Sequence, residues 1–217
     1  MMDFARARRA MVDGQLLAGG VLDQRILSAM GRVPRELFVP EARRALSYLD
    51  EAVAVSPTRL MPDPAGLGRL IQLAEVGSRD VVLDIACGTG YSTAVLAALA
   101  NGVVALEDDP ALVEAANANL VALDIGNAAV VEGPLTGGIA REAPFDVIVI
   151  GGAVDMVPDT LLDQLGEGGR LVAAIGHGNA GVAHLFVRGE GTVTRSAHFN
   201  LSLPALAAFA REETFRF

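Results

Sequence analysis

The sequence predicts an α/β fold with a mostly parallel sheet, an N-terminal helical cap and a C-terminal antiparallel hairpin. From residue 81 onward, apolar runs rich in β-branched residues alternate with helical segments, which is typical of parallel strands joined by helices. The last two apolar runs are separated by Gly189-Glu190-Gly191, so we expect a hairpin there. We divide the chain into an N-terminal helical cap and substrate-side segment, residues 1–76, and a sheet domain, residues 77–217.

Helix signals in the first part of the chain are glycines, prolines and capping carboxylates. Asp23 is placed to cap a helix, Pro40 to start one, and Gly77 to follow the end of one. The expected elements are a helix over 3–30 that breaks near Gly19-Gly20 and resumes over 24–30, a short helix over 41–46, an irregular segment over 48–63 and a helix over 67–75.

Cap signals also divide the sheet domain into strands and helices. Asp109 followed by Pro110 is a strong helix start, because the carboxylate accepts from free N–H groups and proline fits the first helical position. Ser92 is expected to cap the helix after the first strand. The expected strands are 81–85, 103–107, 128–132, 147–150, 170–175, 182–188 and 192–199, and the expected helices are 93–100, 111–123 and 158–165.

A glycine turn follows the first strand of the sheet. Gly88 and Gly90 lack a Cβ atom, so the backbone can turn tightly there and a ligand can approach it closely. The helix that follows begins with free N–H groups facing the same space. A dinucleotide site would need a third glycine where this chain has Thr93, so the turn indicates a different ligand.

Two carboxylates indicate which ligand this turn binds. Asp84 ends the first strand, where it would repel a pyrophosphate and attract an ammonium group. Glu107 ends the second strand, where an acidic side chain can accept from two ribose hydroxyls. An amino acid joined to a nucleoside without phosphate fits both carboxylates, and S-adenosylmethionine (SAM) is such a molecule. The alternative is a strand–turn–helix unit that binds no ligand.

The predicted fold is therefore Rossmann-like, of the class I SAM-dependent methyltransferase type, with S-adenosylhomocysteine as the product. Cys87 is interpreted as a small loop residue and not as a nucleophile, because no histidine partner can be placed beside it. The predicted cofactor-binding residues around the glycine turn and the end of the second strand are Asp84, Ala86, Cys87, Gly88, Thr89, Gly90, Tyr91, Glu107 and Asp108.

Composition limits the partners and the location. The net charge of −9 argues against nonspecific binding to nucleic acid or to an anionic membrane. A single cysteine permits neither an intrachain disulfide nor a cysteine-based zinc site, so we expect no metal and a reducing, cytoplasmic location. The longest apolar stretch is interrupted by Asn101-Gly102 and is too short to span a bilayer. The oligomeric state is left open.

Several segments resemble one enzyme family. Residues 32–40 read R-V-P-R-E-L-F-V-P, and Ser47-Tyr48-Leu49-Asp50 follows them. Together with the glycine turn, they resemble the protein-L-isoaspartate O-methyltransferase family. Residues 143–148 and 165–172 match as well, so the resemblance covers most of residues 20–176. The resemblance implies a SAM-dependent repair enzyme that methylates the α-carboxylate of isoaspartyl residues in proteins or peptides.

The chain departs from that family at two positions. The family usually has a serine that contacts the substrate carboxylate and is regarded as catalytic, and Pro62 stands at the matching position here. After the third strand the family usually has Gly-Asp-Gly, whose aspartate lies by the adenine, and here the sequence is Gly133-Pro134-Leu135. The resemblance implies that Glu132, Gly133, Pro134 and Leu135 also belong to the cofactor-binding residues. The donor site is thus mostly kept, while the acceptor site is altered.

Four residues around the altered position are the acceptor-side candidates. A carboxylate is already ionised near pH 7 and needs no general base, but its binding site needs hydrogen-bond donors. Pro62 supplies none, Thr58 or Arg59 could replace it, and Asp63 adds unfavourable negative charge. Three interpretations follow: an isoaspartyl methyltransferase, a methyltransferase of the same lineage with another protein or a small molecule as acceptor, and a SAM-binding protein without turnover.

Overall fold

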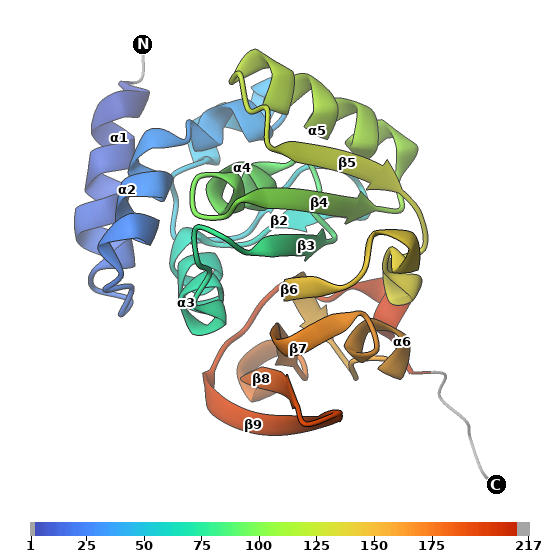
Figure 1. Ribbon diagram of the computed structural model, residues 1–217. Helices are drawn as coiled ribbons and strands as arrows, with labels where there is room; N and C mark the ends of the chain where they lie inside the picture. Colours follow the sequence, from blue (N-terminus) through green and yellow to red (C-terminus); the bar gives the residue numbers. More distant parts are fainter. Residues whose placement is uncertain (1–2, 212–217) are drawn as a thin grey trace, which may run out of the picture.

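The computed structural model of the protein describes residues 3–211 and contains one seven-stranded sheet with the order β5-β4-β3-β6-β7-β8-β9 (Figure 1). Strands β5, β4, β3, β6 and β7 are parallel, and β7, β8 and β9 are antiparallel. The predicted fold class, including the C-terminal hairpin, is confirmed. The strands are β3 Val81–Ile85, β4 Gly102–Glu107, β5 Ala128–Glu132, β6 Phe145–Val154, β7 Leu165–Ile175, β8 Val182–Gly189 and β9 Thr192–Asn200.

Two of the strands exceed their predicted bounds by five residues or more. β6 continues past the predicted end at residue 150, and β7 begins five residues before the predicted start at 170. Because Leu165 already pairs with Phe145, the preceding helix is only the short α6, Asp159–Leu162, and not the predicted 158–165. Pairing with a neighbouring strand therefore overrode the local helical pattern.

The N-terminal cap consists of α1, Phe4–Met11, which continues into a π-helical turn, and α2, Gln24–Arg32. The predicted break near Gly19-Gly20 is confirmed. The side chain of Asp23 caps α2 as predicted, since it accepts from the backbone N–H of Arg25 at 2.8 Å. Two 3-10 segments follow, one over Arg35–Phe38 and one over Glu41–Leu46.

The segment expected to be irregular contains a small antiparallel pair, β1 Val53–Ala54 and β2 Leu60–Met61. Helix α3 follows at once over Pro64–Ala74, three residues earlier than predicted. Asp63 explains the early start, because its carboxylate accepts from the N–H of Gly66 at 2.6 Å and Pro64 occupies the first turn.

The helices of the sheet domain begin with different caps. Helix α5, Pro110–Ala122, starts behind Asp109 as predicted. Helix α4, Tyr91–Ala97, starts behind Gly90, whose φ of +92° suits glycine. The prediction that Ser92 caps α4 is wrong, because Ser92 lies inside the helix and its hydroxyl donates to Asp84.

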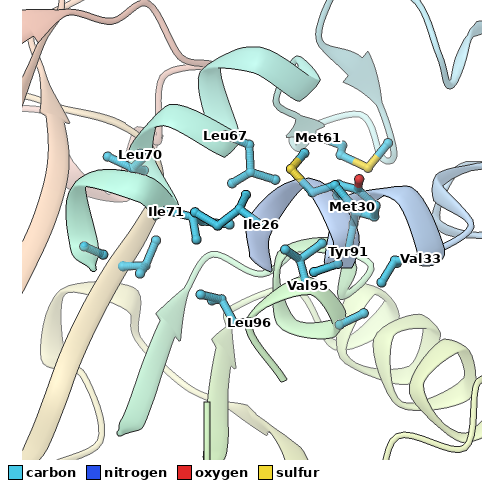
Figure 2. Packing of buried hydrophobic residues seen from close by; sticks show 14 of the residues in the cluster. Ile26, Met30, Val33, Met61, Leu67, Leu70, Ile71, Tyr91, Val95 and Leu96 are labelled. Carbon is cyan, nitrogen blue, oxygen red and sulfur yellow. The ribbon is translucent and has the colours of Figure 1, made fainter. Parts of the chain in front are cut away.

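The cap packs directly on the sheet domain. Figure 2 shows Ile26 and Met30 of α2 beside Leu67 and Ile71 of α3, with Tyr91, Val95 and Leu96 of α4 next to them. All of these side chains are buried and belong to one cluster that also includes Val82 of β3 and Val172 of β7. A second cluster on the other face of the sheet includes Leu83 and Ile85. The sheet is therefore covered on both faces.

The strand order locates a binding crevice. The chain runs from β3 to β4 and β5 on one side and then returns to β6 on the other side of β3. In open parallel sheets, ligands bind beyond the carboxyl ends of the strands at such a reversal.

None of the helices within residues 3–211 is long and apolar enough to cross a membrane.

Candidate functional site

The glycine turn after β3 has a tightly turned backbone that a ligand can approach closely. Gly88 and Gly90 have φ values of +57° and +92°, and Ala86 also adopts a left-handed φ of +62°. Such a conformation is uncommon for a residue with a Cβ atom and is often found at functional sites. The loop is held from both sides, since the Thr89 hydroxyl donates to the carbonyl of Phe38 at 2.5 Å and Asn119 donates to the carbonyl of Thr89 at 2.9 Å.

Asp84 lies under this loop with a fully buried carboxylate. Oδ2 accepts from the hydroxyls of Ser92 at 2.8 Å and Thr93 at 2.7 Å, whereas Oδ1 has no hydrogen-bond partner. Burial raises the pKa of Asp84 to about 6, and the negative charge of Glu107 adds to the rise, against the lowering effect of the two hydroxyls. A buried acceptor without a donor is costly, and an ammonium group would satisfy it.

Glu107 ends β4 directly beside the loop and is also fully buried. Oε2 accepts from the N–H of Gly88 at 2.8 Å, and Oε1 accepts from the N–H of Asp108 at 3.0 Å. The structure thus brings together Asp84, Gly88 and Glu107 as the sequence predicted. Their alignment follows from the parallel register, in which Asp84 pairs with Ala105 and Ile85 with Leu106.

Arg59 reaches the same place from the turn between β1 and β2. Its Nη2 atom lies 2.7 Å from Oε1 of Glu107 and 2.7 Å from Oδ1 of Asp108. We predicted that Arg59 could bind an acceptor carboxylate, and the structure shows its guanidinium bound to two carboxylates of the protein. The Arg59 side chain is 9% exposed, so this is a nearly buried ion pair and not a solvated arginine.

The predicted adenine-side segment lies next to the end of β4. Glu132 is in register with Glu107, and the N–H of Gly133 donates to the carbonyl of Glu107 at 3.0 Å. The Leu135 side chain is buried in the second core cluster, whereas Glu132 and Pro134 are exposed. The position of this segment beside Glu107 agrees with the prediction, whereas a contact with adenine stays a prediction.

The acceptor-side candidates separate into different environments. Pro62 is buried and lines a small cavity of about 20 Å³ together with Gly88 and Tyr91. Thr58 is exposed at the tip of the β1–β2 turn, with its hydroxyl 3.3 Å from that of Ser56. Asp63 caps α3. Of the four candidates, Pro62 and Arg59 are therefore the two that adjoin the glycine loop.

Three polar residues near the site were missed in the sequence. Ser92 and Thr93 hold Asp84, and a signal was present in their position one turn after the loop. Arg35 is completely buried, and its guanidinium donates to the carbonyls of Ser47 and Pro62 and lies 4.8 Å from the ring centre of Tyr91. Arg35 thereby ties the R-V-P-R-E segment to Pro62, the residue that follows β2.

The cysteine and two of the histidines lie in separate environments of the described chain. Burial raises the pKa of the Cys87 thiol well above its ordinary value, which agrees with its interpretation as a loop residue. His177 contacts Asp155 at 2.5 Å on the surface, and His184 contacts Arg195. Among residues 3–211, no group of three histidine, cysteine, aspartate or glutamate side chains is arranged to hold a metal ion.

Comparison with known proteins identifies the family. The model of the family described as protein-L-isoaspartate(D-aspartate) O-methyltransferase (PCMT) matches residues 6–201. The chain belongs to this family. The PCMT relatives include a protein-L-isoaspartate O-methyltransferase from Methanoculleus marisnigri, 39% identical over 79% of this chain and 78% of that protein. Another, from a Roseiflexus species, is 37% identical over 90% of this chain and 88% of its own length.

Solved structures agree with this PCMT assignment. A structure named protein-L-isoaspartate O-methyltransferase superimposes with a TM-score of 0.80 and 26% identity, covering 93% of this chain and 67% of that chain. A Plasmodium falciparum protein described as a PCMT in complex with S-adenosylhomocysteine has a TM-score of 0.76, covers 93% of this chain and 98% of its own, and shares 21% identity. The second likeness concerns the fold alone. The family recognised from residues 32–40 and the glycine loop is therefore confirmed.

Proposed function

We propose that this chain is a SAM-dependent methyltransferase that methylates the α-carboxylate of isoaspartyl residues in proteins or peptides. The observation that carries the proposal is that two buried carboxylates, Asp84 and Glu107, lie beside the glycine loop of a PCMT-family fold. Parallel register places both at the carboxyl ends of neighbouring strands, where ligands bind in such sheets.

The residues at this site fit SAM. Oδ1 of Asp84 is a buried acceptor without a donor, which suits the ammonium of a methionine moiety. Glu107 is the acidic side chain beside the loop that would accept from the ribose hydroxyls, and Gly133-Pro134-Leu135 lies beside it on the adenine side. The loop N–H groups and Tyr91 would complete the donor pocket. The fit extends to the charge of the ligand, because no phosphate has to face Asp84.

When bound, SAM supplies a methyl group on a positively charged sulfur, which an ionised carboxylate can accept without a general base. The protein has to hold the two reactants in line and exclude water, and such positioning is worth roughly 7–11 kcal/mol of barrier in favourable cases. Buried Pro62 and the buried ring of Tyr91 form apolar walls beside the loop. The absence of a catalytic histidine or lysine at this place is therefore consistent with carboxyl methylation.

Pro62 supports a second candidate function, a methyltransferase of the same lineage with another acceptor. Proline offers no hydroxyl or N–H to a substrate carboxylate, and Thr58 points its hydroxyl toward Ser56 on the exposed turn. A small molecule or a different protein would then be the acceptor. A SAM-binding protein without turnover is the third possibility that Pro62 favours.

One experiment separates these functions. Purified protein is incubated with SAM labelled in the methyl group and with a peptide that contains isoaspartate, beside the same peptide with normal aspartate. We expect label in the isoaspartyl peptide alone. Binding of S-adenosylhomocysteine without labelling of either peptide would contradict the isoaspartyl function and favour another acceptor, and absence of that binding would contradict the SAM site itself.

We also infer a cytoplasmic location and no nucleic-acid partner. The supporting observations are the single cysteine, buried as a free thiol, and the net charge of −9. The division into a cap over 1–76 and a sheet domain over 77–217 likewise stays a proposal.

A further inference from the structure

The side chain of Arg59 covers the glycine loop. A Cβ atom placed on Gly88 would lie 3.6 Å from Cγ of Arg59, so the arginine stem passes directly over this glycine. The guanidinium continues to Glu107 and Asp108. The backbone of Arg59 is fixed in the turn, because its carbonyl accepts from the N–H of Val55 at 2.9 Å. Rotation of the side chain can therefore move the guanidinium without breaking this bond.

Arg59 donates to an oxygen of Glu107 that a ribose hydroxyl would need as its acceptor. Glu107 accepts from four donors, which are Nη2 of Arg59 and the N–H groups of Gly88, Asp108 and Asp109. Three of these donors reach Oε1 and one reaches Oε2, so Oε1, with about two lone-pair sites, is saturated by the protein. Glu107 can bind a ribose hydroxyl at each oxygen only after a donor to Oε1 has left, and Arg59 is the one side chain among these three donors.

The space beside the loop also requires a rearrangement. The cavity lined by Pro62, Gly88 and Tyr91 measures about 20 Å³, whereas sites for small-molecule ligands usually measure about 300–1,000 Å³. Nε of Arg59 is buried without a hydrogen-bond partner, so the guanidinium is incompletely satisfied where it lies. A position that gives Nε an acceptor would remove this energetic cost.

We propose that Arg59 exchanges partners during the reaction cycle: the ribose of the donor displaces it from Glu107, and the released guanidinium then binds the carboxylate of the acceptor. This inference rests on the proposed function. It supplies the hydrogen-bond donor that Pro62 lacks, since a guanidinium can hold a carboxylate through two parallel bonds. It also makes donor binding precede acceptor binding, because the cation is engaged by the protein's own carboxylates until the donor arrives.

The first test is the affinity for S-adenosylhomocysteine, measured by calorimetry. In Arg59→Gln the ligand no longer has to displace an ion pair, so we expect binding to be tighter by about tenfold, the worth of one charge-assisted hydrogen bond. Arg141→Gln is the matched control, because Arg141 is exposed and pairs with its neighbour Glu142.

The second test is the affinity for an isoaspartyl peptide. In the wild type we expect the peptide to bind at least about tenfold more tightly when S-adenosylhomocysteine is present, the gain from one charge-assisted contact. In Arg59→Gln this gain should disappear, although the variant binds the nucleoside better. If Arg59 had a purely structural role, Arg59→Gln would lower the affinity for both the nucleoside and the peptide. The circular dichroism spectrum of each variant confirms that it is folded.

The outcomes separate this inference from the function on which it rests. Tighter nucleoside binding and weaker peptide binding in Arg59→Gln would support it. Weaker nucleoside binding in a folded Arg59→Gln protein, or peptide affinity that does not depend on the nucleoside, would overturn it while leaving the methyltransferase function in place. No binding of S-adenosylhomocysteine by the wild type would instead overturn the proposed function.

Discussion

The hydroxyl of Ser92 in α4 donates to the carboxylate of Asp84 in β3 at 2.8 Å. This bond joins the first turn of the helix to the end of the strand, and Thr93 adds a second bond to the same oxygen. The two hydroxyls partly satisfy a carboxylate that has no exposed surface. The remaining oxygen, Oδ1, can accept from a ligand. Because the pKa of Asp84 is raised to about 6, protonation of this carboxylate makes the site depend on pH.

Stability is expected to fall as pH rises from about 4 to 6. The pKa of Asp84 is raised to about 6 in the folded protein and is about 3.9 in an unfolded chain, so the folded state holds the proton more tightly. The loss across this window is about 3 kcal/mol from this one group. Urea unfolding at several pH values measures it. Asp84→Asn should remove this component, whereas Asp50→Asn at an exposed position should keep it.

Affinity for S-adenosylhomocysteine is expected to fall below pH 6. A protonated Asp84 no longer attracts an ammonium group, so binding should release a proton in this range. Calorimetry in two buffers with different ionisation enthalpies counts that proton. A heat of binding that is the same in both buffers at pH 5.5 would show that Asp84 does not face the ammonium.

Glu107→Ala should weaken binding of S-adenosylhomocysteine by about 1–3 kcal/mol, the loss of hydrogen bonds between a carboxylate and the ribose. The same titration on Glu142→Ala, an exposed glutamate outside the site, should match the wild type. If the two variants bind alike, the ribose is held elsewhere.

Asp63→Ala should destabilise the protein by about 1 kcal/mol, because it removes the cap of α3. Asp63→Asn should keep most of that stability, since an amide oxygen can also accept from the N–H of Gly66. Thermal unfolding compares the three proteins. A large loss of methylation in Asp63→Asn without loss of stability would assign the carboxylate to the acceptor site instead.

Pro62→Ser should raise kcat/KM for an isoaspartyl peptide by up to about 10²-fold, the typical worth of one donor to an oxyanion. The serine retains the carbonyl that accepts from Arg35, so the strand keeps its anchor. Pro57→Ser, in the exposed part of the same turn, should leave kcat/KM near the wild-type value. An unchanged rate in Pro62→Ser would mean that this position does not face the acceptor.

The sequence predicted most of the fold because the signals were local. Strand β3 and strand β5 begin and end where the apolar runs do, and Asp23 and Asp109 cap the helices they precede. The misplaced starts of α4 and β7 have non-local causes. Ser92 is drawn to Asp84 and away from a cap role, and Leu165 enters the sheet because Phe145 pairs with it.

The part of the candidate site that depends on the register of parallel strands could be predicted from the sequence. Asp84 and Glu107 end neighbouring parallel strands, so their proximity follows from the pattern. The contact between Arg59 and Glu107 joins residues 48 positions apart through a turn without regular structure, and no periodicity encodes it. Arg35 escaped notice for a similar reason, since an arginine is rarely buried unless carbonyls far along the chain accept its hydrogen bonds.

Helices α2, α3 and α4 share one apolar cluster with strands β3 and β7. A chain cut at residue 77 would lose α3 and uncover the faces of β6 and β7 against which α3 packs. The N-terminal region therefore cannot be exchanged as a module between relatives in the way that a tethered domain can. We expect new acceptors in this lineage to arise through single substitutions near the β1–β2 turn at positions outside the shared core, and Arg59 and Pro62 are two such positions that adjoin the glycine loop.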